Sequence, residues 1–176
     1  ASMRQPESRR QPGDPPRRDA RFIDELNYQL NGAGFIYDHP PKLWIVEVAS
    51  GAARRLTSGR SRDEQPAWSP DGKRIAYVSD RGANPDLAWR TDLTIIDVAG
   101  GRPVRVSAGS ERAFQHPAWS PDGRWIAVSG HRLEAGNPTR EDIHVFRPRA
   151  EQQGRNLTAA ADLFVDALMN SDLGTP

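Results

Sequence analysis

The side chains with the clearest chemical potential in this chain are its four histidines. Histidine can ligate a metal ion or move protons near neutral pH, so the spacing of the four decides whether either role is expected. They are His39, His116, His131 and His144. They stand in four different local contexts, with no His-Glu-x-x-His string and no pair at the spacing of a helical metal site. The sequence therefore predicts no metal centre, and nothing in it calls for another cofactor.

Nucleophile and phosphate motifs are also missing. An α/β-hydrolase serine needs Gly-x-Ser-x-Gly, and the nearest stretch, Gly59 to Asp63, lacks the second glycine. Gly72-Lys73 is followed by Arg74 where a phosphate-binding loop needs Ser or Thr. The chain has no cysteine, which excludes a thiolate nucleophile and a Cys-ligated zinc site. We expect no catalytic residue in this chain.

The elements that would carry any functional residue are repeated. The string Pro-Ala-Trp-Ser-Pro-Asp-Gly occurs from Pro66 to Gly72 and from Pro117 to Gly123, each copy followed two residues later by Ile-Ala. A strand-like segment recurs downstream with starts 50 residues apart, at Leu43 to Thr57, Leu93 to Ser107 and Ile143 to Thr158. A fixed period near 50 built from strand-like pieces is typical of a β-propeller, whose small sheets must stack to bury their faces.

A weaker first copy precedes the two clear ones. Sliding the motif back by 40 residues lays Leu26 to Gly32 over Pro66 to Gly72, with Tyr28 in place of Trp68. Each unit then contains a strand, a tight turn, a strand, a loop, a strand, a turn and a final strand. The predicted fold is all-β, a partial β-propeller of about three four-stranded antiparallel blades with a 50-residue repeat.

The repeated residues themselves are predicted to be structural. In the Ser-Pro-Asp-Gly turn, proline sets φ to about −65°, aspartate bonds the local backbone and glycine takes positive φ, so each copy closes a hairpin. A tryptophan at the same position of two repeats is better explained by packing between blades than by stacking on a sugar or peptide. The residues concerned are Trp68, Asp71, Gly72, Trp119, Asp122 and Gly123.

Two residues remain as candidates for contact with a channel ligand or a partner. His116 stands just before the inner strand of a blade, at the position that Gln65 occupies one repeat earlier, and inner strands line the axial channel of a propeller. Trp89 lies in the long middle loop and has no repeat equivalent. The ordinary alternative for His116 is a solvated side chain without function.

Charge and hydropathy exclude several classes of partner. The 24 Lys and Arg residues balance 23 Asp and Glu, and the basic residues are spread along the chain, so no nucleic acid is expected. No apolar run reaches the length of a membrane span, so no membrane association is expected. The predicted location is the cytoplasm.

Composition also suggests domain limits. Residues 1–20 are rich in Pro and Arg and are predicted to form a flexible tail. Residues 21–176 are predicted to form the partial propeller. Its blades are placed at about 21–62, 63–112 and 113–160, and 161–176 would begin a further blade or form a short helix.

The strings PAWSPDGKRIAYVSDRG and PAWSPDGRWIAV, with the LWIVEVASGAARRLT type of strand pair, resemble the propeller repeats shared by TolB and the prolyl oligopeptidase family of serine peptidases. The resemblance covers about Ala20 to Leu173. The opening Arg21 to Tyr28, the Gly34-Phe35 pair and the stretch Pro41 to Val48 are similar to the acylaminoacyl-peptidase-like branch.

This resemblance implies a propeller that caps a C-terminal α/β-hydrolase domain and admits only short or unfolded peptides. The catalytic Ser, Asp and His of that family belong to the hydrolase domain, and no position here matches their motifs. We therefore expect a non-catalytic, substrate-gating segment of a serine peptidase. Its partners would be the hydrolase domain and remaining blades, or other copies of the chain, with peptides as ligands. The alternative is a TolB-like scaffold for protein-protein interaction, which would be periplasmic.

Overall fold

The computed structural model describes residues 40–81, 90–107, 112–133 and 141–161, together with the backbone of residues 29–30 and 34–35. The regular elements in these ranges are strands. They are β1 (Gln29–Leu30), β2 (Gly34–Phe35), β3 (Trp44–Val46), β4 (Ala53–Arg55), β5 (Asp63–Trp68), β6 (Arg74–Ser79), β7 (Asp92–Asp97), β8 (Val104–Arg105), β9 (Arg112–Trp119), β10 (Ile126–Arg132), β11 (Glu141–Phe146) and β12 (Arg155–Asn156).

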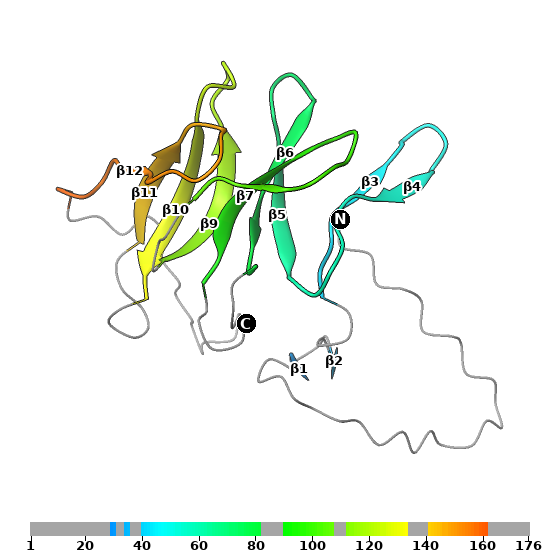
Figure 1. The fold of residues 1–176 in the computed structure, drawn as a ribbon, viewed down its shortest axis with the longest axis horizontal. Coiled ribbons are helices and arrows are strands. Elements are labelled where there is room, and N and C mark those ends of the chain that lie inside the picture. The colour runs from blue at the N-terminus through cyan, green and yellow to red at the C-terminus, as the bar shows by residue number, and fades with distance from the viewer. Residues whose placement is uncertain are drawn as a thin grey trace, which may run out of the picture.

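Eight of these strands form two four-stranded antiparallel sheets that stand side by side (Figure 1). The middle sheet has the order β5-β6-β7-β8, and the last sheet has the order β9-β10-β11-β12. Each strand pairs with its neighbour in the chain, as in a propeller blade. The predicted all-β class with antiparallel four-stranded blades is confirmed for these two units.

The first unit is described only in part. In the described residues it consists of two separate two-stranded sheets, β1-β2 and β3-β4, and β3-β4 packs beside the middle sheet. Residues 36–39, which link β2 to β3, lie outside the described residues. We call β3-β4 the first pair. The four-stranded form of this first blade stays a prediction, because part of the unit lies outside the described residues.

The middle sheet is apolar on both faces because it is packed between two neighbours. Along β6, Ile75 and Tyr77 belong to a cluster shared with the first pair, whereas Ala76 and Val78 belong to a cluster shared with the last sheet. This alternation is the two-residue period of a strand. A strand that is buried on both sides reads as a continuous apolar run, as β6 does.

The larger cluster lies between the middle and last sheets. Its buried members are Ala76, Val78, Leu93, Ile95, Val106, Phe114, Ile126, Val128 and Phe146, with Trp119 packed against them. The smaller cluster joins the first pair to the middle sheet through Leu43, Ile75, Tyr77 and Ile96. The core is therefore a set of layers between sheets rather than one central mass, which is the arrangement that makes stacking obligatory.

Both Ser-Pro-Asp-Gly turns close a hairpin between an inner strand and the next. In the first, the Asp71 carboxylate accepts hydrogen bonds from the Ser69 hydroxyl at 2.6 Å and the Lys73 N–H at 3.1 Å, and Gly72 has φ of 69°. The second repeats these contacts around Asp122, and Gly123 has φ of 67°. The hydroxyl of Ser69 holds the pKa of Asp71 below its ordinary value.

The turn between β11 and β12 covers the outer edge of the middle sheet. The Glu151 N–H donates to the Arg105 carbonyl at 3.0 Å, and the Gln152 N–H donates to the Val106 carbonyl at 2.7 Å. The segment Ile143 to Thr158 has one residue more than the two equivalent segments before it. We attribute the contact between this turn and the β8 edge to that extra residue.

Candidate functional site

The inner strands of the two complete sheets contain the same backbone irregularity. Gln65 and His116 have φ of 52° and 51°, in the left-handed region that non-glycine residues rarely adopt. Each lies where the register of its strand shifts against the next strand. Such a bulge re-aims a side chain. Both side chains are exposed as a result.

The two bulges are linked to each other across the seam between the sheets. The His116 N–H donates to Oε1 of Gln65 at 2.6 Å. Three residues further along the strand, Nε1 of Trp119 donates to the Ala67 carbonyl at 3.1 Å. The inner edge of this seam is therefore closed by two hydrogen bonds, while the turn around Gln152 closes its outer edge.

The imidazole of His116 lies over its own sheet. Its Nδ1 is 3.3 Å from the hydroxyl oxygen of Ser129, which is a pairing of the kind found between a nucleophile and its base. The Ser129 side chain is buried within β10, and its hydroxyl also reaches the Gln115 carbonyl at 3.5 Å. The Ser129 hydroxyl is thus engaged by groups of its own sheet. The pair links the bulge on β9 to the neighbouring strand β10.

The repeated tryptophans occupy unlike environments. Trp119 packs against the larger cluster, and the guanidinium of Arg74 lies 5.0 Å from its ring centre. Trp68 is paired with Ile75 across its sheet, and Trp119 is paired with Ile126 in the same way. Paired residues share a face of the sheet, and both isoleucines face the preceding unit, so both rings do as well. Trp68 is nevertheless 52% exposed. The structural roles of the tryptophans and of the turn residues stay predictions.

A buried ionic group, which sequence reasoning missed, lies where β5 begins. The Asp63 carboxylate is buried and accepts from Nζ of Lys42 at 3.1 Å, the Ser79 hydroxyl at 2.7 Å and Nη2 of Arg81 at 3.1 Å. Lys42 also donates to the Ser61 carbonyl. Lys42 and Asp63 are thus almost fully buried, whereas the Arg81 side chain reaches Asp63 from the surface. Lys42 occupies the repeat position at which the other units have Asp92 and Asp142. This change from an acid to a base was the one feature of the sequence that could have indicated the ionic group.

Burial shifts the proton affinities of this group. Desolvation lowers the pKa of the Lys42 ammonium, although Asp63 opposes the shift. Desolvation raises the pKa of the nearby Tyr77 hydroxyl and of the Asp80 carboxyl. Asp80 is held by the Arg62 N–H at 2.7 Å. Lys42 and Asp63 join the first pair to the middle sheet, whereas the Tyr77 hydroxyl is buried without a hydrogen-bond partner.

His144 is a second feature that the sequence did not indicate. It is buried between the middle and last sheets, with its ring 5.6 Å from that of Phe114 in an edge-on contact. Desolvation, aided by the positive charge of Arg112, lowers the pKa of His144 to about 4. Its Nε2 has no hydrogen-bond partner. His144 is therefore a neutral core residue at physiological pH.

Other expected features can be placed only in part. Trp89 lies outside the described residues, as does the tail at residues 1–20. In the described ranges, no group of three or more His, Asp or Glu side chains is placed to hold a metal ion. Across the same ranges, no helix has the length and apolar character that a membrane crossing requires.

Comparison with known proteins matches this repeat architecture. The family model described as the TolB beta propeller domain matches residues 34–158. The uncharacterized peptidase YuxL of Bacillus subtilis (strain 168) is 30% identical over 128 residues, which are 68% of this chain and 19% of that protein. Dipeptidyl-peptidase 5 of Porphyromonas gingivalis is 38% identical over 66 residues, which are 36% of this chain and 10% of that protein.

A solved TolB structure from Agrobacterium tumefaciens has a similar fold. Its TM-score is 0.55 at 20% identity, with 68% of this chain and 41% of that chain covered. The chain therefore spans a fifth or less of the two peptidases and less than half of the TolB structure. The expected resemblance to propeller repeats of peptidases and TolB is confirmed.

Proposed function

The chain belongs to the TolB beta propeller domain family, and on that premise we propose that it serves as a non-catalytic propeller segment of a serine peptidase. Its role would be to restrict which peptides reach a hydrolase domain. The observation that carries the proposal is the similarity to two proteins named as peptidases, YuxL and dipeptidyl-peptidase 5.

The contacts between the middle and last sheets suggest how such a segment would restrict access. Their seam is tied at the inner edge by Gln65 to His116 and by Trp119 to Ala67. It is also tied at the outer edge by the turn containing Gln152. A seam closed on both edges does not open readily to a polypeptide. In this proposal the seam excludes folded proteins, and the exposed Gln65 and His116 side chains face the peptides that are admitted.

The proposal is tested on the native product that carries this chain, captured from source cells with an antibody raised against the chain. We expect the product to react with a fluorophosphonate probe for active serines, to hydrolyse short peptides and to spare folded proteins. The isolated 19.5 kDa chain, used as a control, should neither react with the probe nor hydrolyse peptides. A captured product without probe reaction or peptide hydrolysis would overturn the proposal and favour the TolB-like scaffold.

Gating is tested separately from hydrolysis. Replacing Trp119 by Ala in the captured product removes a seam contact, so cleavage of longer peptides should rise relative to cleavage of a dipeptide substrate. Trp68→Ala is the matched control, because that ring is largely exposed. An unchanged ratio in Trp119→Ala would reject gating by this seam while leaving the peptidase assignment in place.

A further inference from the structure

The turn between β11 and β12 crosses to a neighbouring sheet. We call its residues, Arg147 to Gly154, the strap. The equivalent turns of the other two units close on themselves. In the first pair the Gly51 N–H donates to the Glu47 carbonyl at 2.8 Å, and in the middle sheet the Gly100 N–H donates to the Asp97 carbonyl at 2.9 Å. The strap therefore makes a connection between sheets that the repeat itself does not require.

The strap is attached to the edge strand β8 of the middle sheet. The Glu151 N–H donates to the Arg105 carbonyl at 3.0 Å, and the Gln152 N–H donates to the Val106 carbonyl at 2.7 Å. The Glu151 carboxylate also lies 3.4 Å from Nη2 of Arg105. Val106 is fully buried as a member of the larger cluster. The strap thus closes the outer edge of the core between the middle and last sheets.

The strap keeps its shape through bonds of its own. Nε2 of Gln152 donates to the Arg147 carbonyl at 2.7 Å and to the Arg149 carbonyl at 2.8 Å. The Arg149 N–H also donates to the Arg147 carbonyl at 2.8 Å. None of these three bonds involves β8. The strap can therefore separate from β8 as one piece and does not have to unravel first.

The attachment to β8 requires an unfavourable backbone conformation. Glu151 has φ of 42°, in the left-handed region that non-glycine residues rarely adopt. A residue persists in that region only where surrounding contacts hold it there. The ion pair of Glu151 with Arg105 contributes little, because the two side chains are 66% and 40% exposed. The attached state of the strap is therefore held by few bonds and opposed by strain at Glu151.

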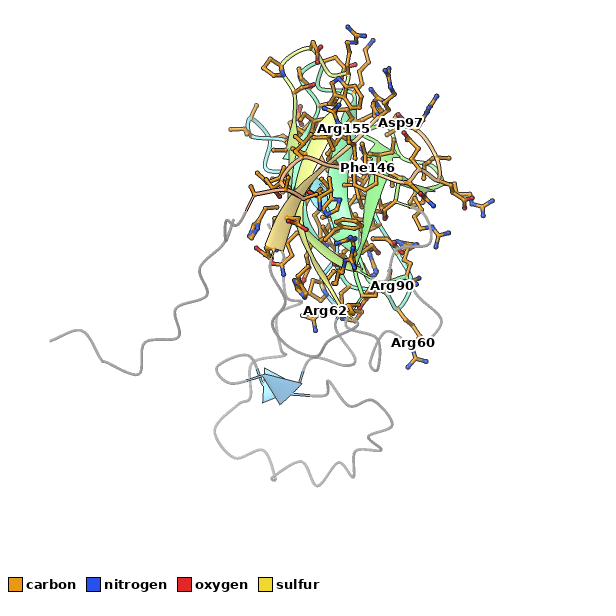
Figure 2. The ribbon with its side chains drawn as sticks, turned by 90° about the vertical axis from the view of Figure 1, so that its left-hand side faces the viewer. Arg60, Arg62, Arg90, Asp97, Phe146 and Arg155 are labelled. Atoms are coloured by element: carbon orange, nitrogen blue, oxygen red, sulfur yellow. The ribbon has the colours of Figure 1, made fainter. Side chains whose placement is uncertain are left out.

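The two ends of the strap are fixed to the core. Figure 2 shows Phe146 and Arg155, the residues at which the strap leaves and rejoins its own sheet, at one end of that sheet. Near the first end, Nη1 of Arg74 reaches the Pro148 carbonyl at 3.4 Å. At the other end, a Cβ on Gly154 would overlap the Phe146 ring. Separation from β8 is thus confined to the middle of the strap.

We propose that the strap is a latch on the seam between the middle and last sheets, and that it releases as one unit while both sheets stay folded. When attached, it covers Val106 and the edge of β8. When released, it leaves the Arg105 and Val106 carbonyls without these partners at an open strand edge. Segments that move in this way belong to the least stable units of a fold. The proposal concerns two sheets that are both described, and it holds with or without peptidase activity.

Hydrogen exchange with residue resolution tests the latch in the native product that carries this chain. In the wild type the Gln152 amide should exchange at least tenfold faster than the amides of β10, because the strap releases without unfolding of the sheet. Glu151→Pro removes the N–H and fixes φ near −65°, so the Gln152 amide should exchange at least tenfold faster still. Exchange in β10 should not change.

Two further variants at the same position separate backbone from side chain. Glu151→Gly relieves the left-handed strain, so the Gln152 amide should exchange about threefold more slowly although the ion pair is lost. Glu151→Gln is the matched control, because it removes the charge but keeps the N–H and the φ preference, and it should change the rate less than twofold. Gly154→Ala reaches the latch independently of Glu151: by displacing the Phe146 ring or the strap it should speed Gln152 exchange.

Four results would overturn the proposal. The first is a wild-type Gln152 amide that exchanges as slowly as β10, because the strap would then open only by unfolding. The second is a shift in the same direction for Glu151→Pro and Glu151→Gly. The third is an effect of Glu151→Gln as large as that of Glu151→Pro, which would assign the attachment to the ion pair. The fourth is unchanged Gln152 exchange in both Glu151→Pro and Gly154→Ala.

Discussion

Where the first pair meets the middle sheet, the contact at the start of the inner strand is ionic, with Asp63 beside Ser79 and Lys42. Where the middle sheet meets the last sheet, the same repeat position holds Phe114 beside Gly130. Asp63 pairs with Ser79 in the same register in which Phe114 pairs with Gly130. The same repeat position can therefore hold either a carboxylate with a paired cation or a tightly packed aromatic ring. The partner residues differ accordingly: Ser79 and Lys42 bind the carboxylate, and Gly130 leaves room for the ring.

The difference also bears on how sheets recognise their neighbours. A buried ion pair contributes little net stability compared with apolar residues of similar size, but it penalises any partner that lacks the opposite charge. Lys42 therefore fits a sheet that carries an acid at the Asp63 position and not one that carries Phe114. This is a physical reason for the sheets to stack in one order.

The largest expected effect is at the ionic interface. Asp63→Leu should lower the free energy of unfolding by about 3–5 kcal/mol, because it leaves Lys42 buried without its counter-charge. The double variant Lys42→Met with Asp63→Leu should recover most of that loss. Urea denaturation measures both. Glu64→Leu is the control, since its exposed pair with Arg62 should contribute less than about 1 kcal/mol. A double variant no more stable than Asp63→Leu would reject the explanation.

The next effect belongs to the aromatic interface and depends on pH. His144 stays neutral in the folded state because its pKa is lowered to about 4, whereas in the unfolded chain it binds a proton below about pH 6.5. Its contribution to stability is therefore present above pH 6.5 and is lost as pH falls toward 4, by roughly 3 kcal/mol.

The comparison variant is His144→Thr, which installs the residue found at the equivalent position, Thr94, of the other interface. Its free energy of unfolding, measured by urea denaturation from pH 7.5 to 4, should fall less steeply than that of the wild type. Parallel pH curves would show that His144 does not cause the acid sensitivity. The turn carboxylates Asp71 and Asp122 are common to both proteins, so their titration cancels from the difference.

A smaller effect concerns Gly130. A Cβ at this position would lie 2.7 Å from a ring carbon of Phe114, closer than real contacts allow. Gly130→Ala should cost about 1–3 kcal/mol through overpacking. In a Phe114→Leu background the added penalty of Gly130→Ala should shrink toward zero, as a double-mutant cycle by urea denaturation would show. Equal penalties in both backgrounds would mean that the Phe114 ring is not the reason why position 130 requires glycine.

The smallest effect separates the two tryptophans. Trp119→Phe keeps an aromatic ring but loses the hydrogen bond to Ala67, which should cost about 1 kcal/mol. Trp68→Phe should cost less, since the ring is 52% exposed and makes no equivalent bond among the described contacts. Thermal unfolding of the two variants side by side measures the difference. A larger loss for Trp68→Phe would contradict the environments described for the two rings.

Much of the fold could be predicted from the repeat. The Pro-Ala-Trp-Ser-Pro-Asp-Gly strings predicted two hairpins, and the strand-like segments beginning at Leu43, Leu93 and Ile143 predicted the third and fourth strands. These predictions succeeded because turn chemistry and two-residue alternation act over a few residues. In the described residues the first unit contributes the pairs β1-β2 and β3-β4, and its repeat is the weakest of the three in sequence.

The candidate site was less accessible to sequence reasoning. His116 could be singled out from its position before an inner strand, but its hydrogen bond to Gln65 depends on the positive φ of a bulge. His144 is buried by residues of other strands, and Lys42 and Asp63 come from different units of the repeat. A single sequence carries no local signal for such contacts.

The sequence by itself determined the period, the turns, the alternation of apolar residues and the absence of nucleophile and metal motifs. All of these depend on residue type and short-range spacing. Only the tertiary structure decided which chemistry each interface uses, which tryptophan is covered and which turn crosses to a neighbouring sheet. Those outcomes depend on what stands on the other side of each sheet, and burial and hydrogen bonding between sheets are properties of the stack rather than of any one repeat.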